Sequence, residues 1–180
     1  MKYLLYLFMM SLFLLGCKSP EPRKPIINKS GSFISESAER NKELNEIENK
    51  KIETLIASMP EKIFLTSKNG FWYSYNIKNE AETLTPDFGD QLQFNYSVSD
   101  LKNNLIYSHE DLGLQTYYMD KEELFQGLRE GLKLMKTGED MTFIFPSQKA
   151  FGYYGDNRKI GTNVPLIVNV NLKTITKNND

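Results

Sequence analysis

Apolar and polar positions divide this 180-residue chain into distinct zones. Apolar and aromatic side chains dominate residues 3–15, and proline, serine and charged residues fill the stretch from 18 to 31. Residues 32–59 then carry apolar side chains near helical spacing, most regularly in the second half. From residue 61 onwards, several segments alternate between apolar and polar positions, which predicts β-strands.

The segment 32–59 is predicted to form a helix. Ser32 or Ser35 can cap its start, and Pro60 ends it. Charged side chains cover the rest of its surface. Its apolar stripe leaves three uses open: docking on its own domain, pairing with a second copy in a homodimer, or binding a client protein. The stripe holds too few regular heptads to predict a coiled coil.

Alternation predicts the strands of a folded domain over 61–180. Two of them are separated by Asn69-Gly70, a strong signal for a hairpin turn. One amphipathic helix is predicted over 121–136, followed by Gly138. Together these elements predict an α+β fold, in which a curved antiparallel β-sheet wraps around one central α-helix. The clearest strand segments are 63–65, 71–75, 91–98, 141–145 and 166–172.

The start of the chain has the layout of a bacterial lipoprotein signal. Lys2 supplies a positive charge, the apolar run follows, and Gly16 directly precedes Cys17. The run is shorter than the ~20 apolar residues that a membrane-spanning helix needs. We therefore expect residues 1–16 to be removed and lipid on Cys17 to hold the protein to a cell-envelope membrane, with the domain in the periplasm. Residues 17–31 would form the tether. The choice between inner and outer membrane stays open.

Composition excludes several classes of function. The formal net charge is −1, which argues against nucleic acid as a partner. Cys17 is the only cysteine and His109 the only histidine. We therefore expect no disulfide, no metal site built from cysteines and histidines, and no cofactor. His109 lies in a run of polar residues and is predicted to be solvated rather than catalytic.

Four stretches, in the right order, resemble the FKBP-type peptidyl-prolyl isomerases over about residues 64–176. They are G-D-Q-L-Q-F-N-Y at 89–96, L-F-Q-G-L-R-E-G-L-K-L-M-K-T-G-E at 124–139, F-P and A-F-G within 145–152, and I-G-T-N-V-P-L-I-V-N-V at 160–170. The helix motif with its two glycines and the A-F-G loop are specific in combination. The lipoprotein signal, the charged helix and segments such as F-W-Y-S-Y-N-I-K-N are further similar to the gliding motility-associated FKBP-type lipoproteins.

The resemblance implies a membrane-anchored peptidyl-prolyl cis-trans isomerase (EC 5.2.1.8) that helps envelope or secreted proteins of the gliding machinery to fold. Its partners would be proline-containing client proteins. Rotation about an X–Pro bond has a barrier of ~20 kcal/mol, and the twisted transition state is less polar than the planar amide. A dry apolar pocket favours that state without a nucleophile, base or metal. The alternative is a catalytically weak or inactive FKBP-like chaperone or scaffold.

The resemblance also implies a proline pocket of aromatic and branched side chains. Tyr96 and Tyr107 would form walls, the Phe125 N–H would bind a peptide carbonyl, and Leu128 would stand at the floor. Without the resemblance, the helix leucines and Val168 would be interpreted as core. The full set expected at the pocket is Tyr96, Tyr107, Ser108, Leu124, Phe125, Leu128, Phe151, Ile160 and Val168.

Three positions depart from the family pattern. Leu128 stands where the family has a tryptophan. Ser108 stands where it has a buried aspartate, or Tyr107 does if the register slips by one. Phe151 replaces a tyrosine whose hydroxyl holds a ligand carbonyl. We therefore expect measurable but low activity on X–Pro peptides and poor affinity for the macrolide ligands of the family.

Overall fold

The computed structural model describes residues 30–178. The expected signal segment 1–16, Cys17 and most of the expected tether lie outside these residues. The chain divides into two compact units between Ser37 and Ala38, and the sheet, the central helix and the larger part of the N-terminal helix belong to the second unit. Within the described range, no helix is both long and apolar enough to cross a membrane.

Helix α2 (Ser30–Ala57) forms where a helix was predicted. It begins two residues earlier than expected, so Ser32 and Ser35 lie inside the helix rather than at its cap. It also ends two residues earlier than expected. The Ser58 N–H still donates to the Thr54 carbonyl in the last helical turn. Pro60 lacks an N–H group and therefore cannot continue the helix.

The C-terminal half of α2 packs on the sheet. Ile52 is fully buried and forms a small apolar cluster with Ile144 and Ile167. In this half, the apolar stripe therefore serves for docking on its own domain, whereas pairing with a second copy and client binding stay predictions. The side chains that surround the cluster are Leu55, Ile56, Met59, Phe64, Trp72 and Leu101.

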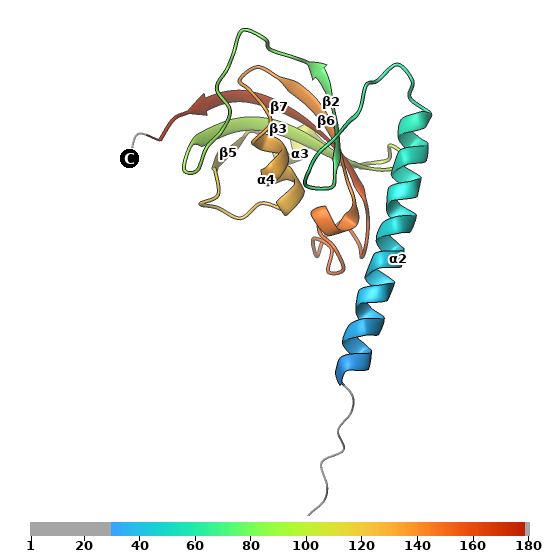
Figure 1. Cartoon of the computed structure of the whole chain (residues 1–180). Helices are drawn as coiled ribbons and strands as arrows, with labels where there is room; N and C mark the ends of the chain where they lie inside the picture. Colours follow the sequence, from blue (N-terminus) through green and yellow to red (C-terminus); the bar gives the residue numbers. More distant parts are fainter. Residues whose placement is uncertain (1–29, 179–180) are drawn as a thin grey trace, which may run out of the picture. The chain divides into compact units, whose positions relative to one another are not determined.

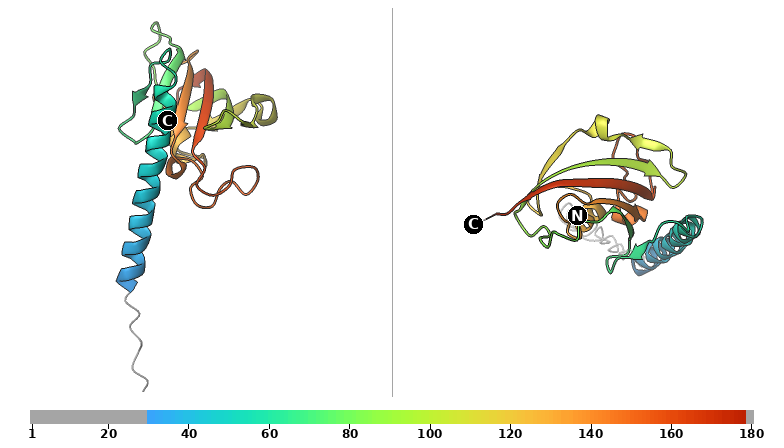
Figure 2. Two further views of the ribbon diagram at one scale, coloured as in Figure 1. Left: turned by 90° about the vertical axis from the view of Figure 1, so that its right-hand side faces the viewer. Right: turned by 90° about the horizontal axis from the view of Figure 1, so that it is seen from above.

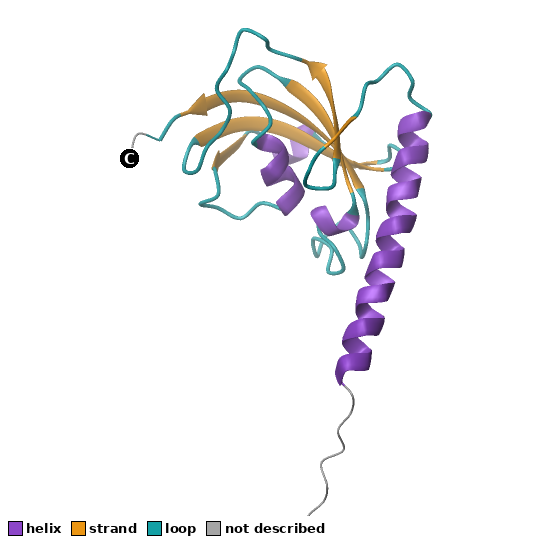
Figure 3. Ribbon diagram, in the orientation of Figure 1, coloured by secondary structure: helices purple, strands orange, loops and turns teal. Residues whose placement is uncertain are grey.

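The described residues form a seven-stranded antiparallel sheet (Figures 1 and 3). Its strand order is β1-β2-β6-β7-β3-β4, and β5 also pairs with β3. The strands are β1 (Leu65–Thr66), β2 (Trp72–Ile77), β3 (Gln91–Asp100), β4 (Leu105–Tyr107), β5 (Gln115–Tyr118), β6 (Asp140–Phe145) and β7 (Leu166–Thr176). The short helices are α3 (His109–Leu112), α4 (Gln126–Leu132) and the 3₁₀ helix η1 (Ser147–Lys149).

The predicted hairpin is confirmed. Strands β1 and β2 pair antiparallel, and the Gly70 N–H donates to the Ser67 carbonyl at 3.1 Å. Gly70 has φ +78°, a conformation that favours a residue without Cβ. Strand β1 is shorter than expected and starts only at Leu65. The strands predicted over 91–98, 141–145 and 166–172 are confirmed, and the structure extends each of them.

The central helix is shorter than predicted. Helix α4 begins at Gln126 and not at 121, because β5 holds the residues that precede it. The Glu122 carboxylate accepts a hydrogen bond from the Tyr118 N–H at 2.9 Å, and the Glu122 carbonyl accepts one from the Tyr117 hydroxyl at 3.3 Å. The residue just before the helix, Phe125, is extended (φ −61°, ψ 145°). The helix motif therefore starts in an extended segment before the helix.

The core lies between α4 and the concave face of the sheet (Figure 2). Leu128 of α4 is fully buried there. Two glycines allow the close approach: a Cβ at Gly127 would lie 2.5 Å from the Phe145 ring, and one at Gly131 would lie 2.9 Å from the Phe143 ring. Packing of α4 on β6 therefore requires the two glycines of the helix motif.

Candidate active site

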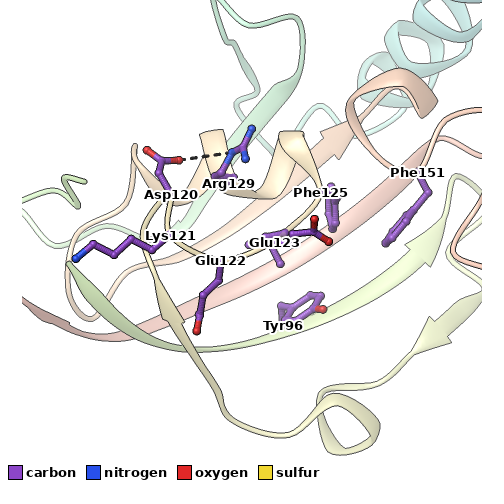
Figure 4. Close-up of a pocket in the computed structure, with 9 residues that line it drawn as sticks. Tyr96, Asp120, Lys121, Glu122, Glu123, Phe125, Arg129 and Phe151 are labelled. Atoms are coloured by element: carbon purple, nitrogen blue, oxygen red, sulfur yellow. Dashed lines mark ion pairs between the residues drawn. The ribbon is translucent and has the colours of Figure 1, made fainter. Parts of the chain in front are cut away.

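A cavity of about 770 Å³ lies between β3, the segment that leads into α4, and the loop after η1 (Figure 4). The structure brings four of the expected pocket residues together on its wall: Tyr96, Leu124, Phe125 and Phe151. The other lining residues are charged, and they are Asp120, Lys121, Glu122, Glu123 and Arg129.

Phe125 is the centre of the aromatic wall. Its ring centroid lies 5.0 Å from that of Phe151 and 5.6 Å from that of Phe145, the latter edge-on. Such ring pairs stabilise a fold by about 0.5–1.5 kcal/mol beyond the area that they bury. Figure 4 shows Phe125, Phe151 and Tyr96 around one opening, although they come from three separate segments of the chain.

Tyr96 lies on the inner face of β3, two residues after the buried Phe94, and the two ring centroids are 5.7 Å apart. Burial, and to a lesser extent the neighbouring Tyr107, raises the pKa of the Tyr96 hydroxyl, which therefore stays protonated at neutral pH. Among residues 30–178, this hydroxyl has no hydrogen-bond partner. It can therefore donate to a peptide carbonyl that enters the cavity.

Three residues expected at the pocket lie in the core rather than on the cavity wall. Leu128 and Val168 are fully buried, and Ile160 is nearly so. All three belong to the main apolar cluster, and the four expected residues that line the cavity pack against this cluster.

Ser108 has a structural use away from the cavity. Its hydroxyl accepts a hydrogen bond from the Asp111 N–H at 3.1 Å, and its own N–H donates to the Asp111 carboxylate at 3.2 Å. This reciprocal pair is a capping box that starts α3. The next residue, His109, is exposed beside Glu110, so its predicted solvation is confirmed.

Tyr107 shares a sheet face with Tyr96. It pairs with Val98 across β3 and β4, and Val98 is two residues from Tyr96 along a strand whose side chains alternate. The Tyr107 hydroxyl donates a hydrogen bond of 2.5 Å to an Oδ atom of Asp156, in the loop after Phe151. This bond ties β4 to that loop.

Asp156 was not among the expected pocket residues, and it organises the loop that follows Phe151. Its other Oδ atom accepts hydrogen bonds from the N–H groups of Arg158 at 2.9 Å and Ile160 at 2.8 Å. An aspartate whose side chain accepts from the backbone N–H two residues later is typical of a turn. This local pattern could have indicated Asp156 from the sequence. The contact with Tyr107 has no such local signal.

The two groups of this pair have opposite pKa shifts. The hydrogen bond to Asp156 raises the pKa of the Tyr107 hydroxyl, and burial adds to the effect. Burial of the Asp156 carboxyl would raise its pKa. The hydrogen bonds from Tyr107 and from the Ile160 and Arg158 N–H groups outweigh burial and lower the pKa below its ordinary value. At neutral pH, a neutral hydroxyl therefore donates to an ionised carboxylate.

Residues 82–173, just over half of the chain, match the family model described as FKBP-type peptidyl-prolyl cis-trans isomerase. The chain belongs to this family. As an FKBP-type peptidyl-prolyl cis-trans isomerase (EC 5.2.1.8), it acts on proline-containing polypeptides.

Two solved structures share the FKBP-like fold. The crystal structure of FkpA from Escherichia coli matches with a TM-score of 0.61 and 21% identity, over 98% of this chain and 82% of that chain. The crystal structure of a peptidyl-prolyl cis-trans isomerase from Pseudomonas syringae pv. tomato matches with a TM-score of 0.58 and 16% identity, over 72% of this chain and 93% of that chain. At these identities the likeness concerns the fold alone. No curated protein sequence matches the chain.

The cavity brings together groups that rotation about an X–Pro bond could use. Leu124, Phe125 and Phe151 form an apolar wall that can receive a proline ring and lower the polarity around the twisting amide. Two donors are available for peptide carbonyls: the Tyr96 hydroxyl and the Phe125 N–H, which has no partner within the described residues. Rotation about the X–Pro bond requires no nucleophile or proton transfer.

Charged residues that were not among the expected pocket residues also line the cavity. Asp120 is compensated by Lys133 at 2.7 Å and Arg129 at 3.5 Å. The Glu122 carboxylate bonds to β5. Glu123 is exposed and has no hydrogen bond or ion pair among residues 30–178. The run D-K-E-E directly before the helix motif could have indicated a charged rim, because it adjoins expected pocket residues.

Proposed function

We propose that this isomerase is a lipid-anchored folding factor that acts at a cell-envelope membrane on proline-containing client proteins, among them proteins of a gliding machinery. Cys17 after an apolar run supports the anchor, and the proline-rich segment after it supports a tether. The similarity of several segments to gliding motility-associated lipoproteins supports the client class. The observation that carries the catalytic part is the cavity whose wall combines Tyr96, Leu124, Phe125 and Phe151.

The catalytic rate of this pocket is expected to be low. Phe151 brings no hydroxyl to the wall, and Ser108 is engaged in the cap of α3. Leu128 lies within the core and exposes no surface to a substrate. The pocket therefore lowers the polarity around the amide but offers few donors to hold it.

A prolyl isomerisation assay on soluble protein (residues 18–180) tests this function. Peptides with several residues before proline should isomerise measurably faster than the uncatalysed background. Tyr96→Ala should lose most of this acceleration, because it removes both a wall and a donor. Tyr118→Ala serves as the matched control, since Tyr118 is exposed on β5 and does not line the cavity. No acceleration on any peptide would contradict the catalytic proposal.

A chaperone or scaffold role is the second candidate, and the three departures from the family pattern favour it. An assay that follows aggregation of an unfolded client without proline isolates binding from catalysis. If wild type and Tyr96→Ala both support gliding in a strain that lacks the native gene, while only wild type isomerises, binding is the important activity.

The membrane anchor has its own test. Metabolic labelling with a fatty acid that carries an alkyne should mark wild type and not Cys17→Ser, and the variant should leave the membrane fraction. Equal labelling of both proteins, or equal membrane recovery, would contradict the anchor without touching the isomerase activity.

A further inference from the structure

A buried carboxylate joins helix α2 to the loop of the proline pocket. Glu48 is 3% exposed, and Ser147, at the start of η1, is fully buried. One carboxylate oxygen of Glu48 accepts from the Ser147 N–H at 2.8 Å, and the other accepts from the Ser147 hydroxyl, also at 2.8 Å. The two residues are 99 positions apart in the sequence.

The same serine holds the turn that carries Phe151. The Ser147 carbonyl accepts hydrogen bonds from the Ala150 N–H at 3.0 Å and from the Gly152 N–H at 2.8 Å. These two donors flank Phe151, whose ring lies 5.0 Å from that of Phe125 on the cavity wall. A continuous set of contacts therefore runs from α2 through Ser147 to the pocket.

Docking of α2 does not by itself call for this carboxylate. Ile52 and its apolar neighbours already bury the helix against β6 and β7. A buried carboxylate is costly to desolvate, and it is retained only where donors satisfy it. Here both donors come from Ser147, so the main effect of Glu48 is to fix the position of that residue.

We infer that Glu48 is a positioning residue of the isomerase pocket, which acts through Ser147 to hold the turn that presents Phe151. This inference rests on the proposed catalytic use of the cavity. Removal of the carboxylate leaves two buried donors without a partner, and the turn must shift to satisfy them. A shift of about 1 Å in a wall residue is enough to reduce kcat/KM by about tenfold or more.

A double-mutant cycle in the soluble protein tests the route from Glu48 to Phe151. Glu48→Ala should lower kcat/KM on X–Pro peptides by about tenfold, and it should cost nothing further once Phe151→Ala is present. Glu46→Ala is the matched control, because Glu46 is exposed on the same helix. The inference is overturned if Glu48→Ala lowers kcat/KM equally with and without Phe151→Ala, or if Glu48→Ala alone does not lower it.

Hydrogen exchange supplies a readout that needs no turnover. The Gly152 N–H should exchange about tenfold faster in Glu48→Ala than in wild type, because its acceptor turn is loosened. Emission from Trp72, the only tryptophan, should stay unchanged, since it reports on the apolar cluster that docks α2. Unchanged Gly152 exchange, or a red shift of Trp72 emission that shows undocking, overturns the inference.

The two proposals fail separately. An inactive wild type contradicts the proposed catalysis, and Gly152 exchange then decides alone whether Glu48 holds the turn. If Glu48→Ala does not fold, Ser147→Ala replaces it under the same criteria, because this variant loses only the hydroxyl bond and keeps the backbone N–H bond to Glu48.

Discussion

The Tyr107 hydroxyl donates a hydrogen bond of 2.5 Å to the carboxylate of Asp156, 49 residues further along the chain. This bond joins β4 to the loop that runs from Phe151 to Ile160, two of the residues expected at the pocket. The Ile160 N–H donates to the other carboxylate oxygen at 2.8 Å. The Asp156 side chain therefore bonds both to its own loop and to β4. Lys159 adds its ammonium 4.9 Å from the centroid of the Tyr107 ring.

The bond between Tyr107 and Asp156 should be sensitive to acid. The Asp156 pKa is lowered in the fold, so its contribution to stability is complete above the unfolded value of ~3.9 and is lost as the pH falls through the folded value. Asp156→Asn should lower Tm by about 2–4 °C at neutral pH. Melting curves recorded from neutral pH to below about pH 3 should show this difference in Tm narrow as the pH falls. Tyr107→Phe should show the same pH dependence. A Tm difference from wild type that stays constant with pH would contradict the role of the Tyr107–Asp156 bond.

The sequence predicted the parts of this fold whose pattern is local. Strand β3 alternates along most of its length, parts of β6 and β7 do so, and Asn69-Gly70 marked the hairpin. The predicted start of α4 was wrong. The residues before the helix are amphipathic, but the Glu122 carbonyl and carboxylate accept hydrogen bonds from the two tyrosines of β5. A periodic pattern cannot show such competition.

The parts of the site that the sequence could not reveal depend on distant contacts. Asp156 meets Tyr107 only because the loop folds onto β4, and Glu48 meets Ser147 only because α2 docks. A charged residue on an amphipathic helix is usually solvated, so the pattern gave no reason to single out Glu48. The family resemblance did single out four residues that line the cavity, because they occupy motif positions, and their roles there stay predictions.

The helix motif glycines should tolerate no side chain. A Cβ at Gly127 would lie 2.5 Å from the Phe145 ring and 2.7 Å from the Lys149 carbonyl oxygen, and the backbone atom cannot rotate away. Gly127→Ala should lower the free energy of unfolding by about 2–3 kcal/mol. Gly161→Ala is the control, because a Cβ there meets no atom within 4 Å. Urea unfolding of both variants checks this, and equal stability would show that α4 can shift away from β6.

Restoring the two aromatic residues of the family should have opposite outcomes. Phe151→Tyr adds a donor at the wall of an open cavity and should raise kcat/KM by about tenfold, the effect of one added hydrogen bond. Leu128→Trp enlarges a fully buried side chain and should cost about 1–3 kcal/mol of stability by overpacking. Peptide assays and urea unfolding on both variants separate the two effects. A tryptophan variant that is both stable and more active would place Leu128 at the cavity instead.

Glu123 should bias the pocket toward clients with a cationic residue next to proline. Its carboxylate lines the cavity, is exposed and has no ion pair within residues 30–178, whereas nearby Asp120 is compensated by Lys133 and Arg129. An exposed pair contributes ~0.2–1 kcal/mol, so peptides with Lys before proline should isomerise up to about fivefold faster than peptides with Glu. Glu123→Gln should remove most of this preference, and about 1 M salt should screen it in wild type. The uncharged Ala-Pro peptide is the control, because its kcat/KM should respond to neither change. A Lys-over-Glu preference that survives in Glu123→Gln would assign the bias to another charge at the rim.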